Sequence, residues 1–199
     1  MNILIVYCHP SEKSYTFEIL QLLKELFYSE NWNVEVSDLY RLNFKSDLSV
    51  TEYEREAFSK IVIPIPEDVL LEHHKIQNAD CILFLYPLWW SDCPAKLKGW
   101  FDRVFTVGFA YKHSEVVPKM KEIPYGVALC TAGHPTSLLE ETGISQSMKN
   151  IMLNDRFGNR FNTKEMIILG GTTSFCNELQ LVHRELILQL IDKIKQQFV

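Results

Sequence analysis

The fold is decided in residues 79–105, which read ADCILFLYPLWWSDCPAKLKGWFDRVF. The run from Ala79 to Tyr86 is the most apolar in the chain and predicts a strand buried on both faces. The run from Ala95 to Phe105 has apolar side chains at helical spacing and predicts an amphipathic helix, with a stripe formed by Leu97, Phe101, Val104 and Phe105. A buried strand followed by a loop and a helix indicates one unit of an α/β sheet.

The same alternation continues on both sides of this stretch. Further strands are expected at residues 3–7, 33–37, 125–130 and 166–169, and further helices at 14–28, 66–78, 137–152 and 177–198. Five strands alternating with helices fit an α/β, flavodoxin-like three-layer sandwich with a five-stranded parallel sheet in the order 2-1-3-4-5.

The strands at 3–7 and 80–86 are expected at the centre of that sheet, because they are short and apolar. The segment from Leu42 to Pro66 is expected to be irregular, either a functional excursion or a subunit contact. No repeat or Gly/Ser linker interrupts the chain, so residues 1–199 are expected to form a single domain.

The composition excludes several classes of protein. Hydrophobic residues make up 47% of the 199 residues and charged residues 23%, which is typical of a globular protein. The net charge of −5, with no basic run, argues against nucleic acid as a partner. No apolar run is long enough to cross a bilayer, and the first residues lack the pattern of a signal peptide, so we expect neither an integral membrane protein nor a signal segment. Five cysteines without zinc or paired spacing predict reduced thiols, a cytoplasmic location and no metal site.

Ligands of open α/β sheets bind beyond the carboxyl ends of the strands, which places three loops at the expected site. The first loop, residues 8–16, runs into a helix whose N-terminus attracts phosphate, with Ser14 and Thr16 as further donors. The alternative for Ser14 is an ordinary helix cap. The loop lacks the glycines of a P-loop or a Rossmann fingerprint.

The second loop, residues 87–94, carries adjacent tryptophans between prolines. A planar cofactor beside Trp89 and Trp90 would explain them, and an aromatic core or a dimer contact is the alternative. The third loop, residues 131–135, contains Gly133, which permits close backbone approach, and a simple turn is the alternative. Because all three loops are expected at one edge of the sheet, together they predict a cofactor site.

The stretch from Asn78 to Phe105, continuing through Gly108-Phe109-Ala110-Tyr111, resembles the NAD(P)H:quinone oxidoreductase family of flavodoxin-like proteins. The first loop and the segment from Asp38 to Phe44 are also similar to that family. The resemblance extends over roughly residues 1 to 145. It implies a homodimer with two flavin sites at its interface, FAD or alternatively FMN as cofactor, and NAD(P)H as co-substrate.

The resemblance further implies ping-pong transfer of a hydride to quinones or related nitroaromatic or azo acceptors, with nicotinamide and acceptor using one face of the flavin in turn. The isoalloxazine would lie on the second and third loops and the phosphates on the first. The residues expected to bind the cofactor are His9, Ser14, Tyr15, Thr16, Pro87, Leu88, Trp89, Trp90, Ser91, Thr131, Ala132, Gly133 and His134.

The chain departs from this family in the third loop and beyond it. Leu139 and Ser145 stand where the mammalian quinone reductases carry a tyrosine and a histidine, so no catalytic acid or base is assigned. His134 replaces a second glycine, and Trp89 replaces a glutamine. We hypothesise that His134 relays a proton, on the basis of its position alone.

Two other functions fit the same fold. One is a flavin-binding regulatory subunit of a potassium-efflux system, which co-purification with a membrane protein would reveal. The other is a flavodoxin-type electron carrier. The chain lacks the hydroxyl- and glycine-rich phosphate loop and the strongly acidic surface of such carriers.

Overall fold

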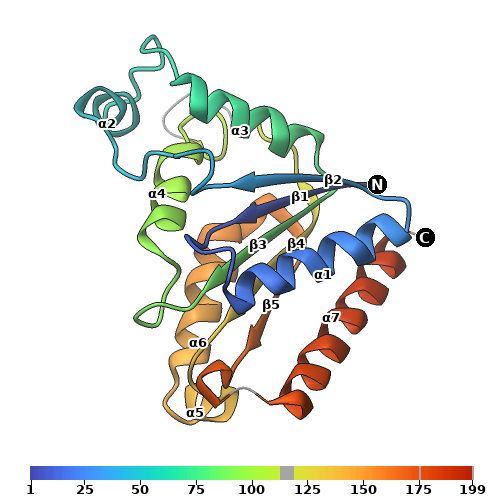
Figure 1. Cartoon of the computed structure of the whole chain (residues 1–199). Coiled ribbons are helices and arrows are strands. Elements are labelled where there is room, and N and C mark those ends of the chain that lie inside the picture. Colours follow the sequence, from blue (N-terminus) through green and yellow to red (C-terminus); the bar gives the residue numbers. More distant parts are fainter. Residues whose placement is uncertain (113–118, 175, 199) are drawn as a thin grey trace.

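Five parallel strands form one sheet in the order β2-β1-β3-β4-β5 (Figure 1). The computed structural model describes residues 1–112, 119–174 and 176–198. The strands are β1 (Asn2–Tyr7), β2 (Asn33–Asp38), β3 (Cys81–Pro87), β4 (Ile123–Thr131) and β5 (Phe161–Leu169). The predicted fold class and strand order are confirmed.

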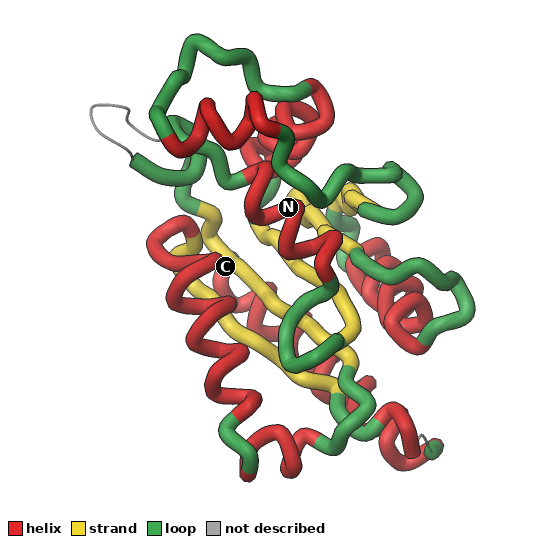
Figure 2. Tube along the Cα trace, turned by 90° about the vertical axis from the view of Figure 1, so that its left-hand side faces the viewer, coloured by secondary structure: helices red, strands yellow, loops and turns green. Residues whose placement is uncertain are grey.

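Helices cover both faces of the sheet, as Figures 1 and 2 show. The longer helices are α1 (Tyr15–Ser29), α3 (Glu67–Asn78), α4 (Ala95–Val104) and α7 (Asn177–Gln197). Helices α1 and α7 pack on one face and bury Leu23, Phe27 and Ile187, whereas α3 and α4 pack on the other and bury Ile76, Trp100 and Val104.

The central strands supply apolar side chains to both faces, as their continuous apolar runs predict. In β1, Ile3 and Ile5 point to one core, and Leu4 and Val6 to the other. All seven residues of β3 are buried. Because every strand is parallel, the loops that follow β1, β3 and β4 lie at the same edge of the sheet.

The structure differs from the predicted secondary structure in two segments. Residues 42–66, which we call the excursion, contain a helix, α2 (Val50–Ala57), that starts with a capping box formed by Ser49 and Glu52. The expected helix at 137–152 is broken into α5 (Thr136–Glu141), α6 (Ile144–Lys149) and the start of a π-helix, η1 (Asn150–Phe157). The break lies at Gly143, whose φ of 73° is left-handed.

The remaining differences concern the ends of elements. Strand β5 begins at Phe161, five residues before the expected Met166. Most side chains in the N-terminal part of β5 are partly exposed, so the apolar run in the sequence is shorter than the strand. The short 3₁₀-helices η2 (Gly158–Arg160) and η3 (Thr172–Ser174) lie before and after β5. Within the described part of the chain, none of the helices combines the length and hydropathy that a bilayer crossing requires.

Candidate functional site

The structure brings the three predicted loops together at the carboxyl edge of the sheet, and we call residues 8–16, 87–94 and 131–135 the strand-edge site. The hydroxyls of Thr16 and Thr131 are 2.7 Å apart, which joins the first loop to the third. The Leu88 amide donates to the Thr131 carbonyl at 2.7 Å, which joins the second loop to the third. The rings of His9 and Trp89 lie 6.1 Å apart, centroid to centroid.

The hydroxyls of the first loop are used within the protein. Ser14 caps α1: its Oγ accepts from the Phe17 amide at 3.1 Å and donates to the Ser11 carbonyl at 2.8 Å. Thr16 is buried against Thr131. A phosphate at this helix start would therefore rely mainly on backbone amides and the helix dipole.

Tyr15 points toward α7 rather than along the site's edge. His183 Nε2 lies 3.1 Å from the Gly170 carbonyl and donates to it, which leaves Nδ1 to accept from the Tyr15 hydroxyl at 2.9 Å. Burial lowers the pKa of His183, partly opposed by its bond to Gly170. This neutral histidine links the first helical turn to the end of β5.

His9 is held in a defined orientation by its own loop. Its Nδ1 accepts from the Ser11 amide at 3.0 Å. Burial lowers the pKa of His9, partly opposed by the Ser11 carbonyl, which lies 3.1 Å from Nδ1 and can accept from the protonated ring, so a neutral ring faces Trp89 at pH 7.

The second loop is a strained turn. Trp89 and Asp92 pair as an antiparallel bridge, with amide-to-carbonyl distances of 3.0 and 3.2 Å. The two residues between them, Trp90 and Ser91, have φ values of 50° and 64°. This left-handed conformation costs about 1–2 kcal/mol for each non-glycine residue.

Trp90 is 100% exposed in this chain and Trp89 is 42% exposed, whereas Pro87 is buried and Leu88 half-buried. An apolar side chain that is fully exposed on a strained turn is typical of a binding surface.

A buried arginine holds the base of this turn. Arg156 of η1 makes two hydrogen bonds of 2.8 Å to the two carboxylate oxygens of Asp92. Burial alone would raise the pKa of Asp92, but the hydrogen bonds from Arg156 and the Cys93 amide outweigh it and hold that pKa below its usual range. Sequence reasoning missed this pair, because 64 residues separate its members.

The third loop has three successive carbonyls occupied and the amides of Gly133 and His134 open. The loop after β5 donates to three successive carbonyls: Thr172 Oγ1 to Ala132 at 3.0 Å, Thr173 Oγ1 to Gly133 at 2.8 Å, and the Gly171 amide to His134 at 2.8 Å.

Among the described residues, the amides of Gly133 and His134 have no hydrogen-bond partner. Two adjacent free amides form a site for negative charge. The sequence did not single out Thr172 or Thr173.

The side chains near the third loop provide little acid–base chemistry. Leu139 and Ser145 are both buried, at 1% and 5% exposure, and His134 is exposed. In the part of the chain that the structure describes, no group of three or more His, Cys, Asp or Glu side chains is arranged to hold a metal ion. The arrangement therefore suits binding and charge stabilisation by the backbone.

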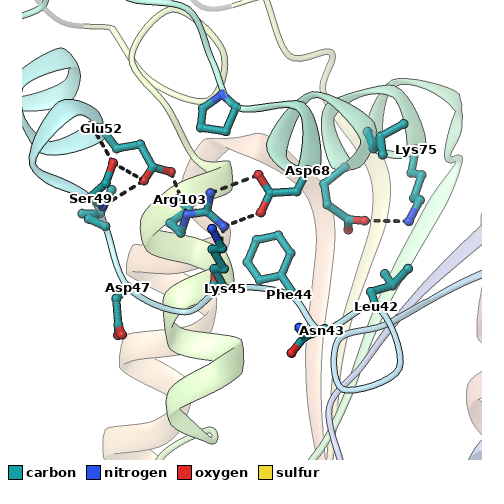
Figure 3. A pocket seen from close by; sticks show the side chains of 14 residues that line it. Leu42, Asn43, Phe44, Lys45, Asp47, Ser49, Glu52, Asp68, Lys75 and Arg103 are labelled. Atoms are coloured by element: carbon teal, nitrogen blue, oxygen red, sulfur yellow. Dashed lines mark hydrogen bonds and ion pairs between the residues drawn. The ribbon is translucent and has the colours of Figure 1, made fainter.

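A cavity of about 690 Å³ lies between the excursion, α3 and α4 (Figure 3). It shares no lining residue with the strand-edge site. Arg103 lies between Glu52 and Asp68, with its Nε 2.7 Å from Glu52 and two further bonds of 2.6 and 3.0 Å to Asp68. The pairs of Arg103 attach the excursion, through Glu52, to α4 and α3. Lys75 pairs with Glu72 at 2.6 Å within α3.

Comparisons with known proteins agree with the fold. A family model described as flavodoxin-like fold matches residues 1–160. An uncharacterized NAD(P)H oxidoreductase of Haemophilus influenzae is 37% identical over 160 residues, which cover 79% of this chain and 77% of that protein. The solved NAD(P)H:quinone oxidoreductase from Methanothermobacter marburgensis has a TM-score of 0.84 and 45% identity, covering 93% of this chain and 91% of that one.

A mammalian relative is longer than this chain. NAD(P)H dehydrogenase (quinone) 1 of Cavia porcellus is 32% identical over 164 residues, which cover 75% of this chain and 59% of that protein. The match therefore spans less than two thirds of that relative's length.

Proposed function

The chain belongs to the flavodoxin-like family that includes NAD(P)H:quinone oxidoreductases, and from that premise we propose that it is a flavin-dependent NAD(P)H oxidoreductase acting on quinones. Nitroaromatic and azo compounds are further acceptors under this proposal. The cofactor is FAD, with FMN as the alternative, and NAD(P)H is the co-substrate. A bound flavin would supply the hydride-transfer chemistry.

One observation carries the proposal: the free amides of Gly133 and His134 and the exposed indole of Trp90 lie on loops that meet at one edge of the sheet. A flavin ring has an apolar portion and a polar, carbonyl-bearing end, and it needs both kinds of surface. The start of α1, at the same edge, suits its phosphate. The residues present therefore fit a flavin.

The chain's own groups would bind and orient rather than transfer protons. The amides of Gly133 and His134 would donate to the end of the ring where negative charge develops on reduction. The carbonyls of Ala132 and Gly133 share peptide planes with these two amides and are tied to the loop after β5, so the amides need little reorganisation. Nicotinamide and acceptor would use the exposed face in turn, which predicts ping-pong kinetics.

The proposed functional unit is a homodimer with its sites at the interface. Exposed apolar side chains gather on α2 and the residues that follow it: Val50 (75% exposed), Tyr53 (55%), Phe58 (62%), Ile61 (54%) and Val62 (87%). A monomer would leave this surface and Trp90 in water. Sedimentation of Val62→Asp should show a weakened dimer, and a monomeric wild type would refute the proposed state.

We also propose a cytoplasmic location. All five cysteines are free, and four of them are buried. Burial raises the pKa of Cys8 and Cys93 to about 12, so these thiols stay protonated and unreactive at neutral pH.

An absorption spectrum tests the central proposal. The protein is incubated with FAD or FMN, freed of excess and scanned, then treated with NAD(P)H without oxygen and finally with a quinone. A retained flavin band that bleaches and then returns supports the function and identifies the cofactor. A protein that retains neither flavin refutes it. Parallel lines in initial-velocity plots would support the ping-pong order, and intersecting lines would contradict it.

A further inference from the structure

The turn that carries Trp90 is held in a conformation that its own residues disfavour. Both central residues of a two-residue turn have positive φ here, an arrangement for which Asn-Gly is the usual pair. This chain has Trp-Ser instead. Such a turn persists only when surrounding contacts restrain it.

Asp92 is the last residue of the turn and its main attachment. Its backbone closes the bridge to Trp89, and its side chain accepts from the Cys93 amide at 2.7 Å and from both terminal nitrogens of Arg156. Paired bonds from a planar guanidinium fix both the position and the orientation of a carboxylate.

Arg156 is anchored more firmly than its partner. It is 7% exposed, lies 5.4 Å from the ring centre of Phe101 on α4, and its Nη1 is 3.3 Å from the Cys93 sulfur. The π-helix η1 presents it, and π-helical turns, which are rare, occur frequently at functional sites. The Asp92 side chain is 44% exposed, so the pair reaches from the core to the base of the turn.

We propose that the Asp92–Arg156 ion pair is a positioning device that holds the strained Trp90–Ser91 turn in its flavin-binding conformation. Arg156 acts through Asp92 and does not touch the cofactor. The turn-holding part of this inference stands on the geometry of this chain, and the flavin-binding part rests on the proposed function.

The turn-holding part is tested on the protein without flavin. Amide hydrogen exchange is followed in the peptide covering residues 86–94. Three proteins are compared: the wild type, the single variant Arg156→Met, and the double variant that combines Arg156→Met with Ser91→Gly. The methionine leaves no buried charge, and Asp92 remains open to water. We expect exchange at the bridge amides to rise about tenfold in Arg156→Met, because the strain is then released.

Glycine at position 91 adopts the left-handed conformation without strain, so the double variant should regain most of the protection. Lys98→Met, which removes the exposed Lys98–Asp102 pair on α4, is the matched control and should leave the peptide unchanged. Unchanged exchange in Arg156→Met, or no recovery with Ser91→Gly, overturns the proposal. If Arg156→Met does not fold, Arg156→Lys replaces it, since an ammonium cannot make both bonds in the same geometry, and unchanged exchange there overturns it equally.

Flavin affinity provides the second readout. We expect the flavin Kd to rise about tenfold in Arg156→Met and to return to within about threefold of the wild type in the double variant. A wild type that binds no flavin, together with the expected exchange pattern, would refute the proposed function and leave the positioning of the turn standing. A flavin Kd unchanged by Arg156→Met would refute the flavin-binding part of this inference.

Discussion

The strand-edge site and the excursion both hold unusual residues, but they use their polar groups in opposite ways. Where the excursion packs on α3 and α4, Arg103 of α4 and its carboxylate partners, Glu52 of α2 and Asp68 of α3, satisfy one another inside the protein. At the strand-edge site, hydrogen bonds occupy the carbonyls of Gly133 and His134 and leave their amides open. Side chains that satisfy one another indicate structure, whereas restrained groups without a partner indicate binding.

The largest expected effect is on stability, from Arg103→Met. This variant leaves Glu52 and Asp68 without their cation, and we expect a loss of about 3 kcal/mol in the free energy of unfolding. Urea unfolding measures it. The flavin Kd of the folded protein should stay within about threefold of the wild type. A large loss of flavin affinity without a loss of stability would break the distinction between the two regions.

The same cluster predicts a pH dependence. Burial alone would raise the pKa values of Glu52 and Asp68, but their hydrogen bonds, mainly with Ser49 and Arg103 respectively, outweigh it and lower both. Their contribution to stability is therefore full above their ordinary pKa values of 4.5 and 3.8 and is lost as the pH falls through the lower folded values. Between pH 7 and pH 3, the urea concentration at the unfolding midpoint should fall less steeply with pH in Arg103→Met than in the wild type. Equal slopes in the two proteins would contradict this.

Two glycine substitutions sharpen the comparison. A Cβ on Gly170 would lie 2.6 Å from the Thr136 amide nitrogen and 2.8 Å from the His134 carbonyl, so Gly170→Ala should displace the third loop. A Cβ on Gly99 would lie 2.1 Å from the Ser46 carbonyl, which displaces the excursion instead.

We expect both glycine variants to lose about 1–3 kcal/mol of stability through overpacking. Only Gly170→Ala should also weaken flavin binding, by about 30-fold, which corresponds to about 2 kcal/mol. Calorimetry and flavin titration on both variants distinguish the regions. Equal flavin affinities would show that the third loop is not part of the site.

A smaller effect is expected from Thr173→Val. It removes the hydroxyl that donates to the Gly133 carbonyl, a bond of about 1 kcal/mol, and should raise the flavin Kd about fivefold by loosening the neighbouring amides. Thr163→Val is the matched control, because its hydroxyl donates to Gln197 on the surface. If both variants bind flavin like the wild type, the loop after β5 does not orient the amides.

His134→Ala gives the smallest effect. Its side chain is exposed beside two free amides, and the proton-relay hypothesis predicts a fall in kcat of several-fold with an unchanged flavin Kd. Steady-state kinetics over a range of pH measures it. Full turnover in the alanine variant would remove the hypothesis.

Local patterns in the sequence were sufficient to predict the sheet and most helices. The apolar runs of β1 and β3 and the capping residue Ser14 are signals that tertiary contacts reinforce. Helix α2 was missed although its capping box, Ser49 and Glu52, stands in the sequence, because Pro64 and Pro66 suggested an irregular segment.

The site was predictable as a set of loops and not as a set of contacts. A topological rule alone brings the three loops to one edge. The hydrogen bonds of Arg156 to Asp92 and of Thr173 to Gly133 join residues far apart in the chain, and no local pattern reveals them. The direction of the Tyr15 hydroxyl toward His183 likewise depends on where α7 packs.

The most direct test of the flavin site is a fluorescence titration with the flavin identified by reconstitution. Indoles close to a bound flavin are quenched, and Trp90 lies at the carboxyl edge of the sheet, whereas Trp32 precedes β2 at the opposite edge. We predict that Trp90→Phe loses much of the flavin-induced quenching and that Trp32→Phe keeps it. Equal quenching in both variants, with flavin bound, would place the cofactor elsewhere and contradict the proposed flavin site.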